Sequence, residues 1–173
     1  MLFIGRLTTI KNIDLLLNAV SLLKDIKVEL KIVGDGYKKS YLKNLTDKLL
    51  LQDQVKFYKG VYDKSNLIKH MNSSHIFVSP GNIGLSVITA LSAGLPVITH
   101  NSFEHQMPEF EILNKDNSYL FIRDDINSLA NCIRLAHIDF MKNELNPYTI
   151  SREWEAKYSA VNQLNIFNKN IYD

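Results

Sequence analysis

Cysteine is almost missing from this sequence: Cys132 is the single one in 173 residues, so the chain cannot form an internal disulfide. A large excess of charge of either sign is missing too, because 20 lysines and arginines stand against 18 aspartates and glutamates, for a net charge of +2. That balance leaves no electrostatic footprint for general nucleic-acid binding. No apolar run approaches the roughly 20 residues of a membrane span, and Met1–Arg6 lacks the layout of a signal peptide. We therefore expect a cytoplasmic protein with no transmembrane segment and no nucleic-acid partner.

What is present is the composition of one globular domain. Hydrophobic residues make up 46% of the chain, beside seven glycines and four prolines. A chain of this length buries roughly 70% of its unfolded surface and needs no disulfide or metal to fold. The segment Met1–Gly5 is apolar from the first residue, as in a buried strand. We therefore expect residues 1–173 to form a single domain cut from a longer protein.

Apolar runs of strand length alternate with helical patterns along the whole chain. The expected strands are Leu2–Ile4, Val28–Val33, Val55–Tyr58, His75–Ser79, Val97–Thr99 and Ser118–Ile122. The expected helices are Lys11–Lys24, Tyr37–Leu50, Lys64–Met71, Gly84–Ala93, Ile126–Lys142 and a long final one, Thr149–Asn168. Strands joined by helical crossovers predict an α/β fold, a Rossmann-like three-layer domain with a parallel sheet of about six strands. In such sheets ligands bind beyond the carboxyl ends of the strands.

Glycine is concentrated in the loops that follow the expected strands. Six of the seven glycines lie there, namely Gly5, Gly34, Gly36, Gly60, Gly81 and Gly84. Glycine lets the backbone approach a ligand closely, so this enrichment indicates a nucleotide-like ligand. Tight turns of any α/β domain also use glycine, and that explanation stays open.

Arg6 and Lys11 follow the first expected strand, and Lys11 stands where a helix is expected to begin. Arginine is not the usual surface cation of this chain, which has four arginines beside sixteen lysines. Two cations at one strand end suit a diphosphate, since arginine offers a fork of donors and lysine a point charge. A solvated pair flanking a turn is the alternative.

The segment Pro80–Ser86 leads from the fourth expected strand into a helix. Either Gly81 or Asn82 is expected to cap that helix. The free amides of Gly84, Leu85 and Ser86 would then point outward and complete an anion cradle with the two cations. A glycine-rich helix cap without a ligand is the alternative.

Other motifs fail on spacing. The segment 34–40 resembles a phosphate loop, but that motif requires glycine at Val33 and Lys38. The histidines are not spaced as metal ligands on one helix, so we expect no metal site. The loop after the fifth strand holds Glu104, His105, Glu109 and Glu111, which would supply an acid or base or else form a polar surface.

Together these residues resemble the nucleotide-sugar-binding half of retaining glycosyltransferases of family 4, which have the two-domain GT-B fold. The likeness spans nearly the whole chain and keeps the order and spacing of its motifs. It rests on residues 3–7 with Lys11 and Asn12, on residues 30–36, 55–60, 84–88 and 93–98, on Pro108 and Glu109, and on Trp154 with Tyr158.

The resemblance implies roles for these positions. Arg6 and Lys11 match the pair that grips the donor diphosphate and stabilises it as it leaves, so they are the expected catalytic residues. The expected donor-binding residues are Gly5, Gly34, Asp35, Gly60, Val61, Gly81, Asn82, Gly84, Leu85, Ser86 and Thr89, with the backbone around Val61 facing the base. No cofactor is implied, and the substrate is a nucleoside diphosphate sugar of UDP or GDP type.

The sequence departs from the family pattern at two positions. The family commonly carries two glutamates separated by seven residues, and Gly81 and Thr89 stand at those positions here. Thr89 would bind a ribose hydroxyl and Asn82 a sugar hydroxyl, while Glu104 or Glu109 would replace a carboxylate. Restoring glutamate at Gly81 and Thr89 is expected to strengthen sugar-nucleotide binding.

The resemblance predicts the donor-binding domain of an enzyme that transfers a sugar to a glycan or lipid-linked acceptor with retention, in bacterial surface polysaccharide synthesis. The acceptor site would lie on an N-terminal domain outside this chain, so the isolated domain would catalyse little. That missing half would also provide any contact with the inner membrane face. Two alternatives remain open: a degenerate nucleotide-binding or regulatory module, and a GT-B-like nucleotide-sugar epimerase.

Overall fold

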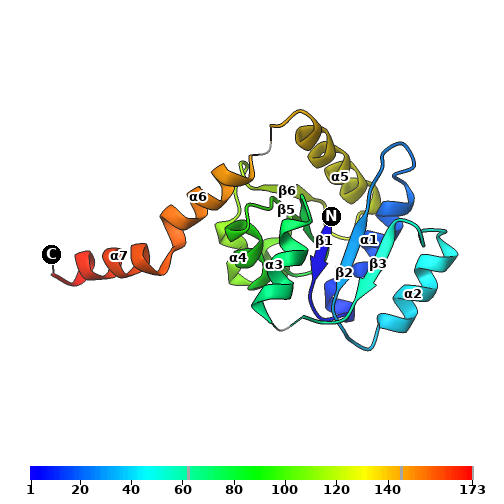
Figure 1. Cartoon of the computed structure of the whole chain (residues 1–173), viewed down its shortest axis with the longest axis horizontal. Helices are drawn as coiled ribbons and strands as arrows, with labels where there is room; N and C mark the ends of the chain where they lie inside the picture. Colours follow the sequence, from blue (N-terminus) through cyan, green and yellow to red (C-terminus); the bar gives the residue numbers. More distant parts are fainter. Residues whose placement is uncertain (62, 145, 173) are drawn as a thin grey trace.

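The computed structural model describes residues 1–61, 63–144 and 146–172. Its described residues form one parallel sheet in the order β3-β2-β1-β4-β5-β6 (Figure 1). The strands are β1 Leu2–Ile4, β2 Leu30–Val33, β3 Val55–Tyr58, β4 Phe77–Ser79, β5 Val97–His100 and β6 Ser118–Phe121. The Rossmann-like α/β fold with six parallel strands is therefore confirmed.

The strand registers bring the loops of different strands to one edge of the sheet. Ile4 pairs with Val33, and Val33 pairs with Tyr58. On the other side of β1, Ser79 pairs with Thr99. The strand order reverses between β1 and β4, and ligands of such sheets bind at that reversal, beyond the carboxyl ends. The loops after β1 and β4 therefore lie where a ligand of this sheet is expected.

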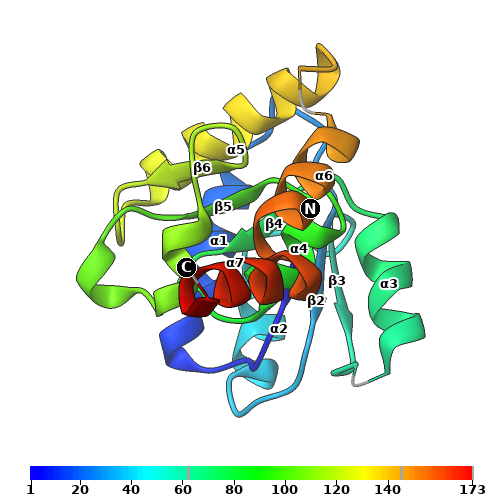
Figure 2. The ribbon, with the colours of Figure 1, turned by 90° about the vertical axis from the view of Figure 1, so that its left-hand side faces the viewer.

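Helices cover both faces of the sheet and bury its apolar side chains (Figures 1 and 2). One face packs against α1 Ile13–Ser21, α2 Lys39–Lys48 and α5 Ile126–Met141. The other packs against α3 Lys64–Asn72, α4 Ser86–Ser92 and α6 Pro147–Tyr158. Cys132 is buried on α5, as its position on an apolar helix face predicted, and burial raises the pKa of its thiol.

The final helix differs from the expectation of one helix over Thr149–Asn168. The chain forms α6, whose Ile150 packs into the core, and then α7 Ala160–Tyr172, which leads away from the body of the domain (Figures 1 and 2). Ser159 separates them in an extended conformation, with φ −61° and ψ 149°. Its hydroxyl accepts a hydrogen bond from the Asn162 amide at 3.3 Å, as at a helix start. No proline or glycine marks this break, so the sequence pattern predicts one continuous helix across it.

Short 3-10 helices occupy segments for which the sequence predicts either an α-helix or a loop. Residues Thr9–Lys11 form η1 ahead of α1, and Asn12 between them is left-handed, with φ 48°. The loop after β5 contains η2 Phe103–His105 and η3 Pro108–Ile112. Among the described residues, no helix has the length and apolar character needed to cross a bilayer.

Candidate functional site

Arg6 and Lys11 lie together at the carboxyl end of β1. The Arg6 side chain is exposed, whereas Lys11 is partly buried and donates from Nζ to the backbone oxygen of Asn82 at 2.7 Å and to its Oδ1 at 3.0 Å. Burial lowers the pKa of Lys11, and the neighbouring Arg6 charge lowers it further. Two cations close enough to repel each other favour an anion between them. The structure thus brings the expected pair together beside the β4–α4 loop.

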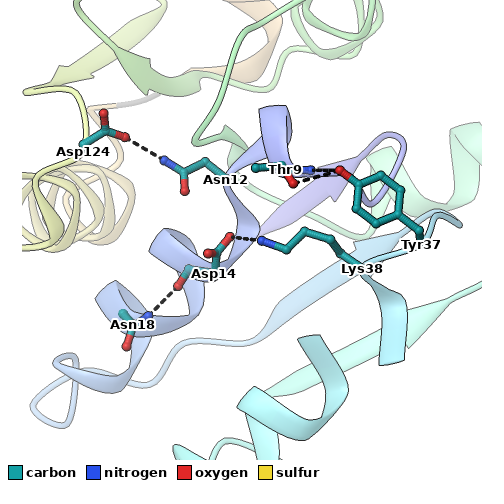
Figure 3. A network of polar contacts seen from close by, with 7 residues as sticks. All are labelled: Thr9, Asn12, Asp14, Asn18, Tyr37, Lys38 and Asp124. Carbon is teal, nitrogen blue, oxygen red and sulfur yellow. Dashed lines mark hydrogen bonds and ion pairs between the residues drawn. The ribbon is translucent and has the colours of Figure 1, made fainter. Parts of the chain in front are cut away.

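The segment Thr9–Asn12, which carries Lys11, is held from two sides (Figure 3). On one side the Thr9 amide donates to the Tyr37 hydroxyl at 3.0 Å. On the other, Asn12 donates from Nδ2 to Asp124 Oδ1 at 2.9 Å, which joins the loops after β1 and β6. Next to it, Lys38 pairs with Asp14 at 3.1 Å. These contacts fix the backbone that positions the Lys11 ammonium group.

The β4–α4 loop does not form the helix cap that the sequence predicts. Both Asn82 oxygens accept from Lys11, and Gly81 has no side chain to offer. The helix α4 starts at Ser86, and the residue before it, Leu85, makes no side-chain cap. The cap at Gly81 or Asn82 is therefore wrong, because the Lys11 ammonium occupies the Asn82 side chain instead.

The amides that follow in this loop remain open. Within the described residues, the amides of Gly84, Leu85 and Ser86 donate no hydrogen bond. An added Cβ at Gly84 would meet no atom within 4 Å, and the Leu85 side chain is 71% exposed. Accessible backbone amides beside Lys11 are suited to bind phosphate oxygens.

Two of the candidate glycines are required by packing. An added Cβ at Gly34 would lie 1.9 Å from the Gly5 carbonyl oxygen, and one at Gly81 would lie 1.9 Å from the Ile10 carbonyl oxygen. Such distances are far inside van der Waals contact, so the β1–α1 loop can pass only where its neighbours are glycines. A glutamate at position 81 therefore requires the β1–α1 loop to move. The effect on binding of glutamate at both Gly81 and Thr89 stays a prediction.

Asp35 acts on the neighbouring loop. Its Oδ2 accepts from the Gly60 amide at 2.7 Å, and its Oδ1 accepts from Lys39. The Lys39 hydrogen bond, and then that of Gly60, lower the pKa of the Asp35 carboxyl. Both oxygens are engaged, so Asp35 positions the loop at Gly60 and Val61. Tyr62, which continues that loop, lies outside the described residues.

The carboxylates of the β5–β6 loop lie in different surroundings. Glu104 is exposed, whereas Glu109 is partly buried and its charge raises the pKa of Lys11. Within the described part of the chain, Glu109 Oε2 is buried without a hydrogen-bond partner. Of these two candidates, the structure therefore brings Glu109 to the Lys11 site. Thr89 lies half-buried on α4.

Gln106 is a structural residue of the site that the sequence pattern does not single out. Its Oε1 accepts from the Ile83 amide at 2.7 Å, and its Nε2 donates to Thr99 Oγ1 at 3.0 Å and to the His100 carbonyl at 2.8 Å. One side chain thus joins the β4–α4 loop to the end of β5. An amide in a polar loop carries no spacing signal from which this role follows.

No set of three or more histidine, cysteine, aspartate or glutamate side chains gathers to hold a metal ion within residues 1–61, 63–144 and 146–172.

Comparison with known proteins places this architecture among glycosyltransferases. A sequence profile described as glycosyl transferases group 1 matches residues 1–148. An uncharacterized glycosyltransferase of Haemophilus influenzae is 31% identical over 134 residues, which are 75% of this chain and 36% of that protein. The chain thus spans about a third of the length of this curated relative.

Solved structures share the fold. Anabaena HepE in complex with UDP superposes with a TM-score of 0.77 at 20% identity, over 98% of this chain and 48% of that one. TarM of S. aureus, whose structure also holds UDP, gives 0.76 at 25% identity, over 96% of this chain and 35% of that one. Such neighbours are GT-B glycosyltransferase domains, so the profile, the relative and the fold agree. The chain belongs to the glycosyl transferases group 1 family.

Proposed function

We propose that this chain binds a nucleoside diphosphate sugar, of UDP or GDP type, as the donor domain of a glycosyltransferase. The observation that carries the proposal is the meeting of Arg6, Lys11 and open backbone amides at the reversal of the strand order. Lys11 contacts Asn82, two residues before Gly84, whose amide donates no hydrogen bond in the described part of the chain. UDP in HepE and TarM supports UDP as the first nucleotide to test.

The same groups would act on the reaction. When the bond between the sugar and the diphosphate breaks, negative charge grows on the leaving diphosphate. Cations and amides held at that place bind the developing charge more strongly than the ground state, and this difference accelerates the step. Removing one such donor in comparable sites costs about 3 kcal/mol of barrier stabilisation. Arg6 and Lys11 are therefore the proposed catalytic residues.

The whole reaction involves more than this chain. We propose transfer to a glycan or lipid-linked acceptor with retention of configuration, in bacterial surface polysaccharide synthesis. Since 36% of the Haemophilus relative is matched here, the acceptor domain is proposed to lie in the remaining length of such a protein. The isolated chain is then a binding domain with little activity of its own.

Calorimetric titration of the chain with UDP and with GDP tests the proposal. We expect one of them to bind at millimolar concentration or below, and binding of neither would overturn it. Binding of the nucleotides without any binding of their sugar derivatives would favour a degenerate nucleotide-binding module.

The Arg6→Ala variant tests the assigned contact. It should weaken UDP by about tenfold, the value of one charge-assisted hydrogen bond, and leave uridine nearly unaffected. Arg152→Ala, which removes another exposed arginine on α6, is the matched control. Equal losses for UDP and uridine in Arg6→Ala would refute the diphosphate contact.

A further inference from the structure

A cavity lies next to the Lys11 site, over the loops that follow β1, β4, β5 and β6. Its volume is about 410 Å³, within the roughly 300–1,000 Å³ typical of small-molecule sites. Its lining includes Ile10, Asn12, Asn82, His100, Arg123 and Asp124. Ile10 and Asn12 flank Lys11 in the chain, and Asn82 accepts the Lys11 hydrogen bonds. A group joined to a diphosphate at Lys11 is therefore next to this cavity.

His100 presents a fixed hydrogen-bond donor to the cavity. The residue is 2% exposed, and its Nδ1 accepts from the Ser102 amide at 3.3 Å. A backbone amide can only donate, so Nδ1 carries no proton and the neutral ring carries it on Nε2. Burial lowers the pKa of His100, which keeps the ring neutral. Within the described residues Nε2–H has no partner, and the cavity is where it can find one.

Two further donors and one carboxylate line the same cavity as His100. Asn82 gives its oxygens to Lys11, which leaves its Nδ2 amide group unpaired within the described residues. Arg123 pairs with Asp124 through Nε at 3.4 Å, and its outer guanidinium nitrogens donate no hydrogen bond within the described residues. Asp124 is engaged by Arg123 and by Asn12, and His105 Nδ1 by the Ser102 hydroxyl. The available groups are therefore mainly donors.

We propose that this cavity binds the carboxylate of an acidic sugar, with His100 Nε2–H, Asn82 Nδ2 and the Arg123 guanidinium as its donors. The inference rests on the proposed function, because the acidic sugar would be attached to the nucleotide held at Lys11. Arginine with a neutral donor beside it is suited to the two oxygens of a carboxylate. Asp124 meets Arg123 at Nε, so a ligand carboxylate would approach the outer guanidinium nitrogens.

Calorimetric titration with UDP-glucuronic acid and UDP-glucose tests the inference, because these donors differ in the group at one carbon. We expect the acidic donor to bind about tenfold more tightly, as one charge-assisted hydrogen bond provides. Equal affinities, or tighter binding of UDP-glucose, would overturn the inference and leave the proposed function standing. Failure of UDP itself to bind would overturn the proposed function instead.

Variants locate the preference. Arg123→Gln, and separately His100→Gln, should weaken UDP-glucuronic acid about tenfold, to the affinity of UDP-glucose. Arg134→Gln is the matched control, since Arg134 is also a partly exposed arginine paired with an aspartate, Asp25 at 3.0 Å. A preference that survives in Arg123→Gln and His100→Gln would overturn the inference.

A last titration separates two sources of the carboxylate. Free glucuronate is added to the chain saturated with UDP-glucuronic acid and to the chain saturated with UDP. Binding in the UDP complex alone places the carboxylate of the donor in the cavity, as proposed. Binding in both complexes would assign the cavity to a separate acidic ligand and overturn the link to the donor.

Discussion

Gly81 and Gly84 stand three residues apart in the β4–α4 loop and differ in what surrounds them. A side chain at Gly81 would collide with the Ile10 carbonyl, whereas one at Gly84 would meet no atom within 4 Å. The same residue type therefore serves packing at one position. At the other, the open space beside free amides is what a ligand would need.

The two alanine variants separate these roles. Gly81→Ala should lower the free energy of unfolding by about 1–3 kcal/mol, as overpacking does. Gly84→Ala should leave it unchanged or raise it by about 0.4–1 kcal/mol through the unfolded chain. Gly84→Ala should nevertheless weaken UDP binding, because its methyl group occupies the approach of the ligand. Urea denaturation and calorimetry measure both quantities, and equal stability losses would contradict the assignment.

Gln106 also contributes to packing between loops, in its case through hydrogen bonds. Replacing it with leucine leaves the Ile83 amide unpaired in a partly buried place, so stability should fall by about 1–3 kcal/mol. Gln106→Glu keeps the acceptor for Ile83 but loses the donor to Thr99 and to the His100 carbonyl. We expect it to lie between leucine and the parent chain in urea denaturation. A leucine variant as stable as the parent would show that the contacts are dispensable.

At the scale of elements, a hydrogen-bonded pair links the β1–α1 and β6–α5 loops. Asn12 donates to Asp124, and both residues are left-handed, with φ 48° and 60°. Glycine adopts such φ values without strain, so Asn12→Gly and Asp124→Gly remove the contact and keep the backbone. A double-mutant cycle in urea should give a coupling of about 0.5–1.5 kcal/mol. Additive losses would mean that the loops are held by other contacts.

Elements were predictable where local pattern decides them. The strands β1 and β3 have the expected bounds, and the other four begin or end within two residues of them. The break at Ser159 does not follow from the sequence, because no proline or glycine marks it. The packing role of Gly81 and the bridging role of Gln106 were missed because each depends on a loop distant in sequence. Local pattern thus locates the edge of the sheet, while the contacts between its loops need the fold.

At the scale of the whole molecule, three histidines act on stability in the same direction. Burial is the largest cause that lowers the pKa of His70, His75 and His100. A histidine whose pKa is lower in the folded state binds fewer protons there than in the unfolded chain. Its contribution is therefore complete above the unfolded pKa of about 6.5 and is lost as the pH falls through the folded value.

Urea denaturation between pH 7.5 and pH 5 checks this sign. The free energy of unfolding should fall as the pH drops, and His100→Gln should make the fall shallower because one titrating group is gone. A profile that is flat or rises on acidification would contradict the assigned pKa directions.

The passage of the β1–α1 loop between Gly34 and Gly81 also bears on the thermodynamics of binding. Ordering a backbone residue costs about 1–2 kcal/mol in conformational entropy, and here that loss has occurred on folding. The loop is thus preorganised: its amides at Leu7, Thr8, Thr9 and Lys11 are all hydrogen-bonded within the chain. Hydrogen exchange at these amides should already be slow without nucleotide and change little when UDP is added. Most of the free energy of each contact with the diphosphate would then remain as affinity.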